Sequence, residues 1–133
     1  MNTTNVLEGK NILIVDDDRI NIMALTAVLK AKKPNIYVAH NGIECLNQLE
    51  KTPKINLILL DLMMPNLDGY QTLEKLTTCP KTKKIPVIIV TARVIRGEKE
   101  KLMNAGACAY IEKPILYDEL INSIQQFITL SEN

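Results

Sequence analysis

The stretch from residue 57 to residue 69 constrains the fold of this chain more than any other. It opens with four consecutive apolar residues, 57–60, and such a short continuous run is typical of a β-strand covered on both faces. A single carboxylate, Asp61, follows directly, and Pro65 and the pair Asp68-Gly69 then supply turn chemistry ahead of a helix. Because a charge at the end of a buried strand is costly unless it is paired, other polar groups are expected to meet Asp61.

Short apolar runs alternate with helical apolar patterns along the rest of the chain. Strands are predicted over 11–15, 36–39, 56–61, 87–91 and 109–111. Helices are predicted over 19–32, from 42 to shortly before Pro53, over 68–78 and 96–104, and from 116 to 127. Strict alternation with short connections favours right-handed crossovers and one parallel sheet with helices on both faces, an α/β fold.

The apolar faces of three helices are predicted from residues at helical spacing. The first helix has Ile20, Met23, Ala24, Ala27 and Ala31. The second has Ile43, Leu46 and Leu49, and the last has Leu116, Leu120, Ile121, Ile124 and Phe127.

The length and the amino-acid composition indicate one globular domain with little net charge. The chain has 133 residues, and 16 basic residues nearly balance 15 acidic ones, so direct nucleic-acid binding or attraction to an anionic membrane is not expected. Residues 1–9 are polar and expected to fray as an N-terminal tail, which leaves 10–130 as the domain. No apolar run approaches the length of a membrane span, no secretory signal opens the chain, and three widely spaced cysteines indicate free thiols, so a cytoplasmic location is predicted.

Polar residues follow four of the five predicted strands. Asp16 and Asp17 follow the first, Asp61 the third, and Lys113 the fifth, while Thr91 ends the fourth. Because parallel strands end at one edge of the sheet, these residues are expected to lie together there.

The second strand offers no matching acid or base, since it ends in Ala39-His40. This places it at the side of the sheet, away from the other strand ends. The resulting order, 2-1-3-4-5, matches the flavodoxin-like doubly wound fold, in which ligands bind where the winding reverses. His40, the sole histidine, is predicted to be an exposed loop residue.

Three carboxylates at one point repel one another unless a cation joins them. Oxygen ligands without histidine or cysteine select a hard ion, and Mg²⁺ fits partial coordination with retained water better than Ca²⁺. Lys113 would add a positive charge and Thr91 a hydroxyl donor, which together suit a phosphoryl group. Asp61 would then supply the attacking oxygen. Asp18 and Asp68 are predicted to cap helices instead.

Five motifs resemble those of the receiver domains of two-component response regulators, and the likeness spans about residues 10–130. They are Ile-Val-Asp-Asp at 14–17, Leu-Asp-Leu-Met-Met-Pro-Asn-Leu-Asp-Gly at 60–69, Val-Thr-Ala at 90–92, Ala-Gly-Ala at 105–107 and Tyr-Ile-Glu-Lys-Pro at 110–114. The resemblance implies phosphorylation of Asp61, with Asp17, Asp61 and the main-chain carbonyl of Met63 binding Mg²⁺ directly and Asp16 acting largely through water.

The resemblance also implies a switch. Lys113 would pair with the phosphoryl group, while Thr91 and the Ala92 amide would receive its oxygens. Movement of Thr91 would let Tyr110 turn inward and change the face formed by the fourth helix, the fifth strand and the fifth helix. The Lys113-Pro114 peptide is expected to be cis, which an X-Pro bond tolerates.

The implied partner is a sensor histidine kinase or a histidine phosphotransfer domain. The chain would be a monomer or a weak phosphorylation-dependent dimer, and not a turnover enzyme. Features such as Asp18-Arg19-Ile20-Asn21 and Gly97-Glu98 resemble receivers of hybrid kinases, so a stand-alone regulator and a hybrid-kinase domain both stay open.

Three other functions compete with phosphoacceptance. A phosphorylation-independent interaction domain on the same fold would not need the complete set of acids, Thr91 and Lys113. A flavin carrier would need a phosphate loop after the first strand, where three aspartates stand instead. A phosphoester hydrolase would need a general acid two residues after Asp61, where Met63 stands.

Overall fold

The computed structural model describes residues 6–51, 54–62, 68–92 and 96–128. The strands are β1 (Asn11–Val15), β2 (Asn35–Ala39), β3 (Leu57–Leu60), β4 (Val87–Thr91) and β5 (Ala109–Glu112). The helices are α1 (Arg19–Lys30), α2 (Gly42–Lys51), α3 (Gly69–Thr78), α4 (Glu98–Asn104) and α5 (Tyr117–Ile128). The predicted alternation is confirmed, and the helix and strand ends differ by only a few residues.

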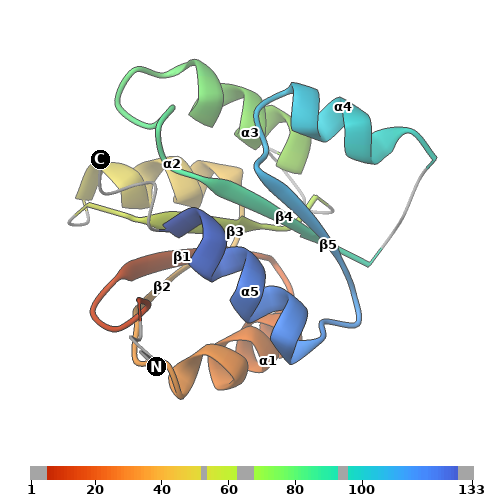
Figure 1. Cartoon of the computed structure of the whole chain (residues 1–133). Helices are drawn as coiled ribbons and strands as arrows, with labels where there is room; N and C mark the ends of the chain where they lie inside the picture. The colour runs from red at the N-terminus through yellow and green to blue at the C-terminus, as the bar shows by residue number, and fades with distance from the viewer. Residues whose placement is uncertain (1–5, 52–53, 63–67, 93–95, 129–133) are drawn as a thin grey trace.

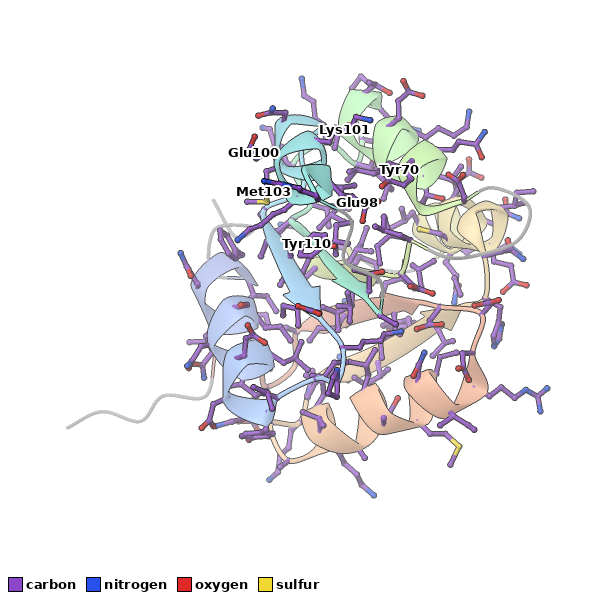
Figure 2. All side chains as sticks on the ribbon, turned by 90° about the vertical axis from the view of Figure 1, so that its right-hand side faces the viewer. Tyr70, Glu98, Glu100, Lys101, Met103 and Tyr110 are labelled. Carbon is purple, nitrogen blue, oxygen red and sulfur yellow. The ribbon has the colours of Figure 1, made fainter. Side chains whose placement is uncertain are left out.

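The strands form one parallel sheet in the order β2-β1-β3-β4-β5, as predicted. Helices α1 and α5 cover one face, while α2, α3 and α4 cover the other (Figure 1). Helix α4 lies next to α3 on its face in both views of the whole domain (Figure 1; Figure 2). This three-layer arrangement is the flavodoxin-like doubly wound fold, and its winding reverses between β1 and β3.

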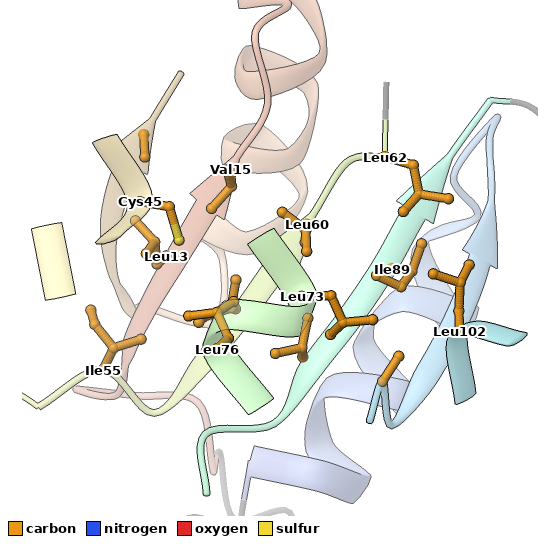
Figure 3. Packing of buried hydrophobic residues seen from close by; sticks show 14 residues of the cluster. Leu13, Val15, Cys45, Ile55, Leu60, Leu62, Leu73, Leu76, Ile89 and Leu102 are labelled. Carbon is orange, nitrogen blue, oxygen red and sulfur yellow. The ribbon is translucent and has the colours of Figure 1, made fainter. Parts of the chain in front are cut away.

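Strand β3 explains why the sheet needs both helical layers. Its four apolar side chains alternate between the faces: Ile58 and Leu60 join the core under α2 and α3, while Leu57 and Leu59 join the core over α1 and α5. Figure 3 shows the first of these cores, with Leu73 of α3 packed against the strands. The continuous apolar run at 57–60 is therefore a doubly covered central strand, as predicted.

The predicted apolar face of α1 is wrong. Ile20 is 75% exposed and Met23 is 69% exposed, whereas Leu25 and Leu29 are buried against the sheet. The helix carries two apolar stripes, and the one with the larger branched side chains packs on the core because it removes more apolar surface from water. The stripe of Ile20, Met23, Ala24, Ala27 and Ala31 is exposed to solvent.

Smaller corrections concern α2, α5 and the N-terminus. Ile43 and Leu116 are 53% and 65% exposed, so neither belongs to the core. Cys45 takes the central buried position of α2 instead. Leu7 lies in the segment predicted to fray, but it is fully buried in the core over α1 and α5, so the packed structure begins before residue 10.

Among the described helices, none combines the length and apolar character needed to cross a bilayer.

Candidate functional site

Three carboxylates meet where β1 and β3 end. One oxygen from each of Asp16, Asp17 and Asp61 lies within 4.8 Å of the other two. Main-chain hydrogen bonds continue the sheet past the strand ends: the Asp16 amide donates to Ala39 at 3.0 Å, and the Asp61 amide donates to Val15 at 2.9 Å. These bonds fix the backbone of Asp16 and Asp61, and both residues are buried, while Asp17 is exposed.

Lys113 is the cation of this cluster. Its Nζ lies 3.2 Å from Oδ2 of Asp16, and both side chains are largely buried, at 12% and 3% exposure. The Lys113 amide donates to the Thr91 carbonyl at 2.8 Å, which fixes the start of the loop after β5. The next peptide, Lys113-Pro114, is cis as expected. Lys113 was expected to face a phosphoryl group on Asp61; in this structure its ion pair is with Asp16.

The charges explain why this cluster suits a divalent cation. Two unit charges about 5 Å apart repel by roughly 3 kcal/mol at an effective dielectric constant of about 20. With all groups ionised, Lys113 offsets one of three negative charges and leaves two. Oxygen-only ligands with that residual charge fit a hard divalent ion such as Mg²⁺, and a mixed soft-ligand site for zinc or copper fits poorly.

Two neighbouring aspartates cap helices, as predicted. The Asp18 carboxylate accepts from the Ile20 amide at 2.9 Å at the start of α1. Asp68 accepts from the Gln71 amide at 2.9 Å, and the Gln71 side chain accepts from the Asp68 amide, which completes a capping box on α3. Neither belongs to the carboxylate cluster.

Gly69 allows α3 to begin directly against the loop of Asp61. A Cβ atom at this position would lie 2.4 Å from Cα of Leu62 and 2.7 Å from the carbonyl oxygen of Asp61. The Gly69 amide instead donates to the Leu62 carbonyl at 3.2 Å. The glycine of the Asp68-Gly69 pair is therefore required by close backbone approach.

Thr91 and Tyr110 share the sheet face under α3 and α4. Tyr110 stands beside Ile89 in the register of β4 and β5, and Thr91 follows on the same face of β4 two residues later. Thr91 is fully buried and Tyr110 half-buried, while Ala92 is exposed immediately after β4. Met63, the predicted source of a metal-binding carbonyl, lies outside the described residues.

A buried acid at the start of α4 was not predicted from the sequence. Glu98 is only 6% exposed, and it accepts hydrogen bonds from the hydroxyl groups of Tyr70 and Tyr110. In the sequence it stands among Lys99, Glu100 and Lys101 and looks like one residue of a solvated helix. Only the fold reveals its burial, because its partners come from α3 and β5.

His40 lies on the surface, as predicted. Its Nδ1 is 3.1 Å from a carboxylate oxygen of Glu44, and its amide donates to the same oxygen at 2.9 Å. These bonds to His40 lower the pKa of Glu44. The pair belongs to the start of α2, outside the carboxylate cluster.

The chain matches the family of response regulator receiver domains over residues 12–125. It is 30% identical to the polar-differentiation response regulator DivK of Brucella anthropi, with 90% of this chain and 96% of that protein covered. The chain therefore belongs to the receiver domains of two-component response regulators.

Other relatives carry the same domain within longer proteins. The chain is 36% identical to the probable transcriptional regulator ycf29 of Porphyra purpurea, and 89% of it aligns with 56% of that protein. It is 32% identical to the histidine-protein kinase BarA of Escherichia coli, of which it spans 12%. The chain thus covers about half or less of these relatives.

Solved structures of receiver domains share the fold of this chain. The receiver domain of sensor histidine kinase PA1611 from Pseudomonas aeruginosa, which holds a magnesium ion in its active site cleft, is 28% identical with a TM-score of 0.82, covering 91% of this chain and 98% of that one. A CheY-like receiver domain protein from Methanospirillum hungatei is 30% identical with a TM-score of 0.83, covering 94% and 98%.

Proposed function

We propose that this domain accepts a phosphoryl group on Asp61 from a phosphohistidine of a sensor histidine kinase or a histidine phosphotransfer domain. The single observation that supports this most is the convergence of Asp16, Asp17 and Asp61, with Lys113 bonded to Asp16. Family membership supports the same function. The domain receives the group and promotes its own phosphorylation, and it turns over no separate small substrate.

In the proposed transfer, a carboxylate oxygen of Asp61 attacks the phosphorus. A phosphorus–oxygen bond forms as the phosphorus–nitrogen bond breaks, and that electron pair stays on the departing imidazole. Asp61 becomes an acyl phosphate, which adds about −1.5 to −2 charges and three acceptor oxygens. Lys113 turns from Asp16 to one of these oxygens, and the Thr91 hydroxyl and Ala92 amide donate to the others.

Asp17 and Asp61 would hold Mg²⁺ directly with the Met63 carbonyl, and Asp16 would act through water. When bound, the ion supplies charge neutralisation on the phosphoryl oxygens. The protein residues orient the incoming group and Asp61, while the buried sheet edge limits the access of water.

The exposed stripe on α1 supports the choice of donor. Asp18 caps α1 beside the carboxylate cluster, so Ile20 and Met23 stand at the rim of the site. Along the same side, Asn21, Ala24 and Val28 line a cavity of about 300 Å³ together with Lys113, Pro114 and Ile115. A donor histidine carried on a helical protein would bring an apolar surface against this stripe.

The proposed output is a changed face formed by α4, β5 and α5, read by a protein partner in the cytoplasm. Nucleic-acid binding by the described domain is not part of the proposal, and the proposed assembly is a monomer or a weak dimer after phosphorylation. The phosphoryl group must contact the conformation with the changed face better than the resting conformation. A group that contacts both conformations equally would not shift the equilibrium between them.

Intact-mass measurement tests the proposal. Incubation with acetyl phosphate and Mg²⁺ should add the mass of one phosphoryl group to the protein. A chelator present from the start should prevent this gain, and later treatment with alkali should remove it. Asp61→Asn should show no adduct, while Asp68→Asn, which keeps the α3 cap, should resemble the parent. An adduct that persists in Asp61→Asn contradicts the assignment; no adduct in the folded parent favours a phosphorylation-independent interaction domain.

A further inference from the structure

A buried carboxylate links three elements on the face that carries Tyr110. Glu98 of α4 is 6% exposed and accepts from Tyr70 of α3 and from Tyr110 of β5, the latter at 3.3 Å. Figure 2 shows Glu98 between the two tyrosines, with Tyr70 on the α3 side and Tyr110 on the sheet side. The mechanism proposed for Asp61 makes no use of this carboxylate.

The contact has the strength to bias a conformational equilibrium. A carboxylate taken out of water is costly unless hydrogen bonds replace its hydration, and the two tyrosine hydroxyl groups provide such bonds. Bonds to a charged acceptor contribute more than neutral ones. Turning Tyr110 away would break one of these two hydrogen bonds. Glu98 would then have less to replace the hydration that it loses on burial. Burial, followed by the charge and hydrogen bond of Glu98, also raises the pKa of Tyr110.

Position on the sheet connects this contact with the phosphorylation site. Tyr110 lies on the same face as Thr91, beside Ile89, and Lys113 follows the end of β5 three residues after Tyr110. Thr91 is fully buried, so its movement toward a group on Asp61 alters the packing next to Tyr110. A bond that fixes Tyr110 therefore opposes that movement.

We propose that Glu98 acts as a latch that holds the resting state: its bond to Tyr110 opposes activation, and its bond to Tyr70 anchors α4 to α3. This inference rests on the proposed phosphorylation of Asp61 and on the predicted switch role of Tyr110. Activation must break the bond between Glu98 and Tyr110, so weakening the latch makes the active state easier to reach. Glu98 is a positioning residue and does not touch the transferred group.

Titration with beryllofluoride in the presence of Mg²⁺ tests the latch. Backbone NMR of the whole chain would report the midpoint. Glu98→Gln should lower the midpoint about three- to tenfold, because it weakens a charged hydrogen bond that opposes activation. Glu100→Gln, an exposed acid on the same helix, should leave it unchanged. Tyr110→Phe should also lower the midpoint, and the double variant should gain little over either single one.

A second readout separates the latch from ordinary packing. In protein carrying ¹³C-labelled tyrosine, Glu98→Gln should lower the pKa of Tyr110 toward its ordinary value, with no such change in Glu100→Gln. If Glu98→Gln does not fold, Tyr110→Phe alone decides, and an unchanged midpoint overturns the latch. Midpoints that stay at the parent value, or effects that add fully in the double variant, also overturn it. A folded parent that ignores beryllofluoride contradicts the proposed function itself.

Discussion

Asp17 and Asp18 are neighbours in the sequence, but their side chains have different surroundings. Asp17 brings an oxygen within 4.8 Å of both Asp16 and Asp61. Asp18 turns toward α1 and accepts from the Ile20 amide. A ligand of the proposed metal and a helix cap thus stand side by side, and matched substitutions can separate the two roles.

We expect Asp17→Asn to weaken Mg²⁺ binding at least about tenfold, because it removes one charged ligand from the cluster. Asp18→Asn should change it less than about twofold, since asparagine also caps helices and Asp18 lies outside the cluster. A magnesium titration followed through the amides around Asp61 measures both. Equal losses in the two variants would contradict the assignment of Asp17 as a ligand.

The caps and the carboxylates could be predicted at the level of single residues, whereas the role of Glu98 could not. The carboxylates of Asp18 and Asp68 accept hydrogen bonds from amides two or three residues away, so the local sequence is enough to predict their capping roles. Asp16 and Asp61 follow apolar strands, which places them at the same sheet edge. Glu98 is buried by Tyr70 and Tyr110, which lie 28 and 12 residues away, and no local pattern encodes that contact.

Helix α1 shows what periodicity determines and what it leaves open. The 3.6-residue period identifies a helix, but both apolar stripes satisfy it. Packing then selects Leu25 and Leu29 for the core, and Ile20 and Met23 face outward. The stripe that was predicted to be buried is therefore an exposed apolar surface at the rim of the site.

Met23→Glu tests whether this surface receives the donor. Because a charge on a 69%-exposed position costs little in the free domain, stability should change by no more than about 0.5 kcal/mol. Phosphorylation by acetyl phosphate should be unaffected, whereas transfer from a phosphohistidine donor should slow about tenfold or more, as for a lost apolar anchor.

Ile43→Glu on α2 is the matched control, since this residue is also exposed but lies on the opposite face of the sheet. Its rate of transfer should equal that of the parent. Equal slowing in both variants, or none in Met23→Glu, would contradict docking on α1.

At the scale of the whole molecule, the parallel sheet connects remote parts of the sequence. Asp16 and Lys113 are 97 residues apart, yet their charged atoms lie 3.2 Å apart because β1 and β5 end at one edge. The alternation of strands and helices predicted this edge, and the strand without an acid or base was correctly placed at the side of the sheet. The choice of Asp16 as the partner of Lys113 depended on side-chain packing and could not be predicted.

Asp61, at the same edge, is the residue proposed to accept the phosphoryl group. Borohydride reduction after treatment with acetyl phosphate and Mg²⁺ converts an aspartyl phosphate to homoserine, and peptide mapping by mass spectrometry then locates it. Homoserine is expected at position 61 alone, and only when the phosphodonor and Mg²⁺ are both present. Homoserine at position 16 or 17, or none in the folded protein, would contradict it.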